Sequence, residues 1–171
     1  SLSLSLIFSF FVSFSSVLII CYFTTRTEFE TQLLFWTIGF FGYLIICLSK
    51  VENNILSKLL ALAFVLRLIA CFSFPVLSDD IYRFIWDGEL NIHNISVYEF
   101  KPSQVPENSI PDQKVLLENL NSKDYVSVYP PINQAIFSIG AYLGNSIYWK
   151  MLTIKLILLL GEISLLLLIQ K

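Results

Sequence analysis

Residues 7–23 read IFSFFVSFSSVLIICYF, and no charged residue occurs anywhere in 1–25. A helix of roughly 20 apolar residues crosses the ~30 Å hydrocarbon core of a bilayer. This stretch therefore predicts a transmembrane helix near the start of the chain. A cleaved signal peptide is the alternative interpretation, but the basic residues and the small-residue cleavage site that define such a peptide are both missing.

Further apolar stretches occupy 33–48, 55–77, 132–149 and 151–169, and each predicts another span. The 171 residues are 56% hydrophobic and 14% charged, whereas soluble domains carry about 25% charged residues. The net charge is −2 and there is no basic block, so nothing in the sequence indicates a nucleic-acid partner. The three cysteines are scattered through apolar stretches, which favours buried thiols over a disulfide framework or a metal site. We therefore expect an all-α, polytopic integral membrane protein.

The expected organisation is one membrane domain with a long polar insertion. Residues 1–77 would hold three transmembrane helices, residues 78–130 a loop, and residues 131–171 two further transmembrane helices. Within the loop, apolar residues recur at helical spacing in 114–121 and predict a short amphipathic helix. The chain begins with serine and its last apolar stretch runs to the end, so we expect a fragment of a longer protein.

Basic residues predict the orientation. Lys50 and Lys58 cluster at the second turn, Lys150 falls between the last two predicted spans, and the first loop has only Arg26. Because cytoplasmic loops are enriched in lysine and arginine, the lysine-bearing turns are placed in the cytoplasm. The loop at 78–130 is then extracytoplasmic.

The densest cluster of ionisable side chains is SDDIYRFIWDG at 78–88. In a helix, Asp80, Arg83 and Asp87 share one face, and Asp79 meets Arg83 at i+4. An arginine between acids keeps one carboxylate ionised, while repulsion between the acids raises the proton affinity of another. A general base for a sugar hydroxyl needs such an environment.

A purely structural interpretation of the same segment is equally open. Ser78 is a good N-cap, and acids in the first turn complement the helix dipole. Arg83 would then be no more than an ion-pair partner of Asp87. Two further residues of the segment, Tyr82 and Trp86, are of the type that lines membrane interfaces.

A second unusual cluster, Tyr129-Pro-Pro-Ile-Asn-Gln134, lies just before the next apolar stretch. Together, the two clusters resemble motifs of the GT-C superfamily of polytopic glycosyltransferases, and the chain is similar to its bacterial mannosyltransferase-like members. In those proteins a Gly-x-Asn-Pro-Tyr element stands between the two. Here the corresponding residues are Asn94-Ile-Ser-Val-Tyr98, which keep the tyrosine and lack the Asn-Pro. The resemblance covers about residues 60–165.

The resemblance implies a GT-C-like helical bundle in the bacterial cytoplasmic (inner) membrane. The implied reaction transfers a hexose, plausibly mannose, from a polyprenyl-phosphate donor to a glycan or lipid acceptor outside the cytoplasm, with inversion. Asp79 or Asp80 would be the catalytic base, with some preference for Asp79, and a divalent cation (Mg or Mn) held by the pair is possible. The implied substrate-binding residues are Tyr82, Arg83, Trp86, Asp87, Tyr98, Tyr129, Gln134, Lys155 and Glu162.

Lys155 and Glu162 lie in the last apolar stretch, seven residues apart and so on one helix face. A charge at the centre of a bilayer costs about 2.5–3.5 kcal/mol unless it is paired or faces a polar cavity. Both residues are therefore expected to face inward and to serve in packing or in binding the donor phosphate. The alternative for Lys155 is that it extends to the interface near Met151.

The competing class is a non-enzymatic membrane protein, such as a transporter or an assembly subunit. In it, Asp80, Arg83, Lys155 and Glu162 would merely pair helices. A catalytically incomplete fragment is a further alternative. An enzyme needs its acids open to a cavity, whereas a packing role buries them against basic partners.

Overall fold

The computed structural model describes residues 4–75 and 77–169, and all regular elements in these residues are helical. The all-α class is thus confirmed for this part of the chain. Two compact units are present, Ser1–Leu77 and Ser78–Lys171.

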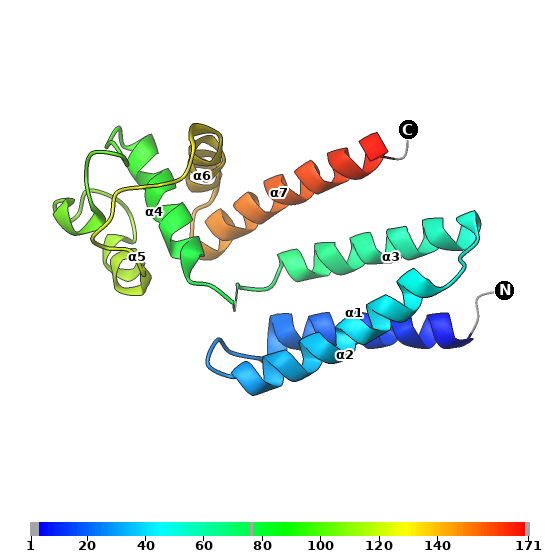
Figure 1. Cartoon of the computed structure of the whole chain (residues 1–171). Coiled ribbons are helices and arrows are strands. Elements are labelled where there is room, and N and C mark those ends of the chain that lie inside the picture. The colour runs from blue at the N-terminus through cyan, green and yellow to red at the C-terminus, as the bar shows by residue number, and fades with distance from the viewer. Residues whose placement is uncertain (1–3, 76, 170–171) are drawn as a thin grey trace. The chain divides into compact units, whose positions relative to one another are not determined.

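The first unit contains α1 (Leu4–Phe23), α2 (Phe29–Leu48) and α3 (Asn53–Cys71) (Figure 1). All three are long and apolar enough to cross a membrane. Helices α1 and α2 pack through small residues, because Ser13 Oγ donates to the Gly39 carbonyl at 2.9 Å and a Cβ on Gly42 would lie 2.8 Å from the Ser9 carbonyl oxygen. Small residues allow the close approach that helix association in lipid requires.

The second unit contains α4 (Asp80–Ile92), a 3-10 turn (Pro102–Gln104), α5 (Gln113–Asn119), α6 (Pro131–Leu143) and α7 (Ile147–Ile169). Helix α4 packs mainly against α6 and also contacts α5 and α7. The fully buried apolar side chains of this unit include Ile85, Trp86, Leu90, Val97, Leu116, Met151 and Ile154. The short helix predicted at 114–121 is confirmed as α5, and its Leu116 is buried in this core.

The stretch at 132–149 is not one continuous helix. Helix α6 has 13 residues, which corresponds to about 20 Å and falls short of the ~30 Å hydrocarbon core. The chain turns at 144–146, where Gly-Asn-Ser interrupts the apolar sequence. The described residues therefore contain four helices of spanning length and composition, with α7 as the fourth, where the sequence predicted five.

Helices α4 and α6 approach closely at Gly88. A Cβ at this position would collide with the Phe137 carbonyl oxygen, and it would lie 3.1 Å from the Ala141 Cβ. The obstacle is backbone, which cannot move without separating the two helices. The site network described below is built across this contact.

Gly88→Ala is therefore expected to destabilise the second unit by about 1–3 kcal/mol, the usual cost of overpacking. The matched control is Gly161→Ala on α7, where an added Cβ meets nothing within 4 Å. Thermal unfolding in detergent micelles measures both variants. An equal midpoint for the two would contradict the close contact between α4 and α6.

Candidate functional site

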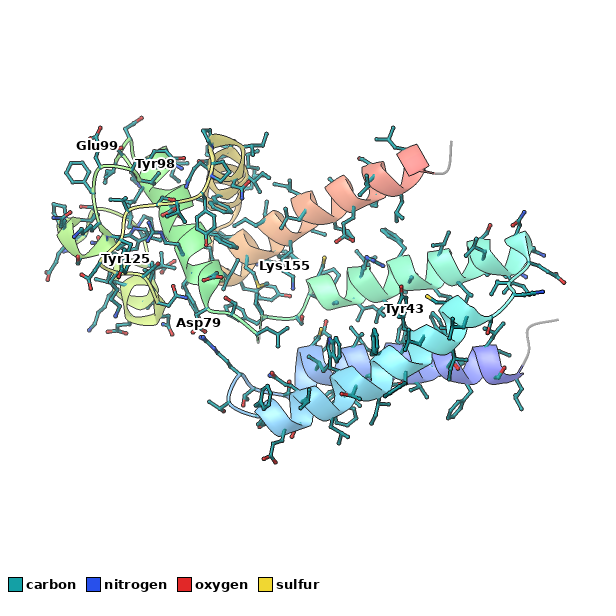
Figure 2. The ribbon with its side chains drawn as sticks, in the orientation of Figure 1. Tyr43, Asp79, Tyr98, Glu99, Tyr125 and Lys155 are labelled. Atoms are coloured by element: carbon teal, nitrogen blue, oxygen red, sulfur yellow. The ribbon has the colours of Figure 1, made fainter. Side chains whose placement is uncertain are left out.

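The two adjacent aspartates lie at the start of α4. Asp79 immediately precedes the helix and Asp80 is its first residue, and Figure 2 shows Asp79 at this end of α4. Ser78 Oγ accepts the Asp80 backbone N–H at 3.2 Å, but the N-cap residue of α4 is Asp79, one residue later than the sequence predicted. The Asp80 carboxylate accepts a hydrogen bond from Asn121 Nδ2 at 3.0 Å. Both acids are only partly buried.

Arg83, one turn further along α4, is 4% exposed. Its Nε donates to Asp87 Oδ1 at 2.8 Å. Its Nη1 donates to the carbonyl oxygens of Ser122 and Tyr125, at 3.1 and 3.0 Å. The guanidinium thus holds segment 122–125 against α4. The i,i+4 pairing of Arg83 with Asp87 is confirmed.

Asp87 connects α4 to the Tyr129–Gln134 cluster. It is fully buried, and its Oδ2 accepts hydrogen bonds from Ser127 Oγ at 2.5 Å and from Gln134 Nε2 at 3.0 Å. The other end of the Gln134 amide accepts from Asn91 Nδ2 at 2.9 Å. Buried ions are tolerated when paired and hydrogen-bonded in this way. The term Asp87 network is used for Arg83, Asp87, Asn91, Ser127 and Gln134.

Tyr129 lies beside this network in an aromatic cluster. Its ring meets Phe84 and Phe137 edge-on, with centroids 5.1 and 5.5 Å apart, and those two rings stack on each other at 4.6 Å. Its carbonyl oxygen accepts the Tyr98 hydroxyl at 2.7 Å. Edge-to-face contacts of this kind orient the Tyr129 ring.

The pKa of Tyr129 is raised above its usual value. Burial is the main cause, and the negative charges of Asp80 and Asp87 add to it, whereas Arg83 opposes it. Both burial and nearby carboxylates disfavour a phenolate. The charge of Asp80 therefore affects the pKa of the Tyr129 hydroxyl, and the two motifs share one electrostatic environment.

Tyr129 is expected to ionise above the ordinary tyrosine pKa of about 10. The folded state then holds this proton more tightly than the unfolded state. The contribution of this proton to the free energy of unfolding is fully present below pH ~10. It is lost as the pH rises through the higher pKa that Tyr129 has in the folded state. Difference absorbance titration of the parent protein against Tyr129→Phe measures the effect. Asp80→Asn removes a neighbouring negative charge and should bring the pKa of Tyr129 down; an unchanged titration would show that the two side chains do not interact.

The structure brings most of the predicted site residues together. Asp80, Arg83, Asp87, Tyr98, Tyr129 and Gln134 are connected by the contacts above. Lys155 and Glu162 both lie on α7, two turns apart, and Figure 2 marks Lys155 in the first half of that helix. Tyr82 is a partly buried residue of α4. Their predicted roles in binding substrate stay predictions.

Trp86 is placed differently from the interfacial position that its residue type suggested. Its side chain has no exposed surface and belongs to the core of the second unit. Its indole Nε1 is buried without a hydrogen-bond partner. Trp86 therefore supports α4 from within and does not present its ring to lipid or solvent in this structure.

Lys150 also has a role that the sequence did not reveal. Its Nζ lies 2.8 Å from Glu89 Oε1 on α4 and 3.5 Å from Asp112 Oδ2, and its side chain is 4% exposed. Because Glu89 and Asp112 belong to 78–130, Lys150 pairs with the segment that the sequence predicted on the other side of the membrane from it. Lys150 therefore gives the predicted orientation no support, and that prediction rests on Lys50 and Lys58.

Sequence reasoning missed several members of the site, namely Asn91, Ser127, Asn121 and Glu89. Ser127 and Gln134 are separated from Asp87 by 40 and 47 residues, so spacing alone carries no signal for them. Glu89 follows the motif directly. Its position as an acid in the middle of an amphipathic helix is the one signal in the sequence that could have identified it as a member of the site.

The described residues contain no group of three or more acidic, histidine or cysteine side chains suited to a metal ion. Magnesium commonly binds through one or two carboxylates together with substrate phosphates. The adjacent acids Asp79 and Asp80 fit that donor set, so a divalent cation stays a prediction. His93, the single histidine, lies with its Nδ1 2.8 Å from the Glu89 carbonyl oxygen.

Comparison with protein-family models, with curated proteins and with solved structures finds no match to this chain.

Proposed function

We propose that this chain acts as a membrane glycosyltransferase of the GT-C type. It transfers a hexose, with mannose the first candidate, from a polyprenyl-phosphate donor to a glycan or lipid acceptor. The observation that carries the proposal is the convergence of the two motifs. The Asp-Asp segment and the Tyr-Pro-Pro-x-x-Gln segment meet through the bonds from Ser127 and Gln134 to Asp87 and through the charge of Asp80 near Tyr129.

Asp80 is the residue to which we give the role of base. It is partly exposed, and its described partner is the neutral amide of Asn121. Asp87, in contrast, is fully buried and paired with Arg83, so an acceptor cannot reach it. The resemblance itself allows either Asp79 or Asp80, and the electrostatic effect of Asp80 on Tyr129 favours Asp80.

The proposed step is a single displacement with inversion. Asp80 takes the proton of the acceptor hydroxyl while the acceptor oxygen bonds to the anomeric carbon. The bond from that carbon to the donor phosphate breaks, and polyprenyl phosphate leaves with the bonding electron pair. Lys155 is the candidate for stabilising the phosphate charge, because the Arg83 guanidinium is already used to hold segment 122–125.

A divalent cation would be held by Asp79 and Asp80, where it would neutralise charge on the donor phosphate.

The extracytoplasmic position of the site belongs to this proposal as well. It is supported by Lys50 in the turn between α2 and α3 and by Lys58 near the start of α3, which place that turn in the cytoplasm under the positive-inside rule. The membrane is proposed to be the bacterial cytoplasmic membrane. Labelling of an introduced Lys123→Cys by a membrane-impermeant maleimide in intact cells tests the side.

A non-enzymatic membrane protein is the second candidate. Two buried ion pairs favour it, Arg83 with Asp87 and Lys150 with Glu89, since charges that only pair helices are expected to be buried in this way. On this interpretation Asp80 would only complement the dipole at the start of α4 and hold Asn121.

The deciding experiment incubates membranes containing the chain with a set of radiolabelled polyprenyl-phosphate sugars. The proposal expects one sugar to be transferred to an endogenous glycan or lipid, above the level of matched membranes without the chain. Absence of transfer from every donor in the set, with the chain inserted and folded, would favour the non-enzymatic class.

A further inference from the structure

Helix α6 has one face that no part of the second unit covers. The inward face, with Gln134, Phe137, Gly140 and Ala141, is buried. The opposite side is exposed and is formed by Ile132, Ala135, Ile139, Tyr142 and Leu143, which we call the α6 outer face. These positions recur at helical spacing, so they form one continuous stripe along the helix.

The α6 outer face is apolar over its whole length. Ile132 is 72% exposed, Tyr142 79% and Leu143 64%. The surrounding sequence contains no charged residue between Asp124 and Lys150. A contiguous exposed patch of this kind marks a surface that meets lipid or another protein.

Several polar groups of α6 are satisfied within the second unit. Ser138 Oγ donates back to the Gln134 carbonyl at 2.8 Å, and the Gln134 side chain is held by the Asp87 network. At the start of the helix, the N–H groups of Asn133 and Gln134 both donate to the Pro130 carbonyl. Hydrocarbon accepts only backbone whose hydrogen bonds are made internally, and the helical backbone of α6 makes its bonds in this way between its ends.

The connection to α7 favours lipid as the occupant. The short turn 144–146 ties α6 to α7, which is long and apolar enough to cross a membrane. Around this turn lie Tyr142, Tyr148 and Trp149, all exposed. Tyrosine and tryptophan concentrate where hydrocarbon meets the headgroups, so this junction has the composition of a membrane surface.

The direction of α6 fits that surface. Figure 1 shows α6 foreshortened while α7 extends across the view, so the two helices are not parallel. Their crossing is close at Gly140, where an added Cβ would lie 3.1 Å from the Lys150 carbonyl oxygen. Because α6 has only 13 residues and is not parallel to α7, a position along the plane of the bilayer fits it better than a crossing one.

We propose that α6 lies in the membrane interface, with the α6 outer face in the lipid acyl region and its inner face holding the Asp87 network. The short helix would thus seat the second unit on the bilayer and keep Tyr129 close to the membrane surface. Interfacial helices of this kind bury their apolar face about 5–10 Å below the headgroup boundary. The inference does not depend on transferase activity.

Site-directed spin labelling in vesicles of palmitoyl-oleoyl phosphatidylcholine tests the proposal. The native cysteines are first replaced by alanine, and a nitroxide is then attached to Ile132→Cys, Ala135→Cys, Ile139→Cys or Leu143→Cys in the full chain. Lys123→Cys serves as the water-exposed control, and Leu165→Cys on α7 serves as the lipid-exposed control, since both native side chains are exposed.

The expected result is that labels on the α6 outer face collide readily with oxygen and rarely with a water-soluble nickel complex, as at Leu165. Their depths should be alike from Ile132 to Leu143. A crossing helix would instead change depth by about 1.5 Å per residue, which would overturn the in-plane position. Collision with nickel as at Lys123 would overturn lipid contact, and shielding from both reagents would show that protein, for example a second copy, covers the face.

Discussion

Asp80→Asn is expected to lower sugar transfer by about 10²–10⁴-fold, the usual contribution of a general base. The substitution keeps the shape of the side chain, and the new amide oxygen can still accept the hydrogen bond that Asn121 Nδ2 donates at 3.0 Å. It removes the negative charge that an acceptor hydroxyl needs for deprotonation. The measurement is the initial rate of transfer from the radiolabelled polyprenyl-phosphate sugar that proves active.

The matched control is Asp124→Asn. Asp124 is an exposed carboxylate of the same unit, and its Oδ1 accepts a hydrogen bond from Ser103 Oγ at 3.3 Å. Its substitution changes the net charge in the same way and should leave the rate within about twofold, because surface charges far from reacting groups are screened.

Asp79→Asn distinguishes the roles of the two adjacent acids. If Asp79→Asn abolished transfer and Asp80→Asn did not, the base would be Asp79, as the sequence alone favours. If both variants kept the parental rate, neither acid would be the base and the proposed mechanism would fail. Thermal unfolding of each variant shows whether a loss of rate reflects a loss of fold.

The sequence predicted the local structure of the site better than its tertiary contacts. The helix at the Asp-Asp segment follows from residue spacing, and the pairing of Arg83 with Asp87 follows from the i,i+4 geometry. Ser127 reaches the same carboxylate from 40 residues away. Nothing in local spacing encodes such a contact, because it depends on how the chain returns after α5.

Residue type misled the interpretation of Trp86 and Lys150. Tryptophan beside a membrane stretch is typical of an interface, yet the close packing of α4 against α6 leaves Trp86 fully buried. A lysine between two apolar stretches is typical of a cytoplasmic turn, yet Lys150 pairs with Glu89. In both cases a tertiary contact determines the position, and composition does not report it.

The sequence contains a signal for the end of α6, but hydropathy obscures it. Gly144-Asn145-Ser146 is a turn signal, but it lies inside a long uncharged stretch, and mean hydropathy hides such a break. A single apolar stretch of ordinary spanning length thus divides into a short helix and the first turn of α7. Turn residues deserve equal weight with hydropathy when spans are counted.

A large loss of stability is expected on substitution of Asp87, because its carboxylate connects three segments of the chain. Arg83, Ser127 and Gln134 all donate to it. Asp87→Ala leaves the Arg83 guanidinium buried without its counter-charge. Removing one partner of a buried ion pair costs about 3–5 kcal/mol, which for a unit of this size corresponds to a fall of the unfolding midpoint by about 10 °C or more.

Trp86 provides a local probe of this unfolding, because it adjoins Asp87 in sequence and its ring is fully buried. In a Trp36→Phe, Trp149→Phe background its emission reports the second unit alone, as these are the other two of the three tryptophans. Asp124→Ala is the control, with an expected change within about 0.5 kcal/mol, as for most surface sites. A midpoint for Asp87→Ala equal to that of this control would contradict a structural role for the network.

The double variant Arg83→Met with Asp87→Leu distinguishes charge from packing. An apolar pair of similar volume often replaces a buried ion pair at little cost, so the double variant should recover much of the stability that Asp87→Ala loses. Arg83 also holds the carbonyl oxygens of Ser122 and Tyr125, and these bonds are not restored. Recovery of stability would show that the loss in Asp87→Ala comes from the unpaired Arg83 charge, whereas no recovery at all would show that the loss comes from the unsatisfied loop carbonyls.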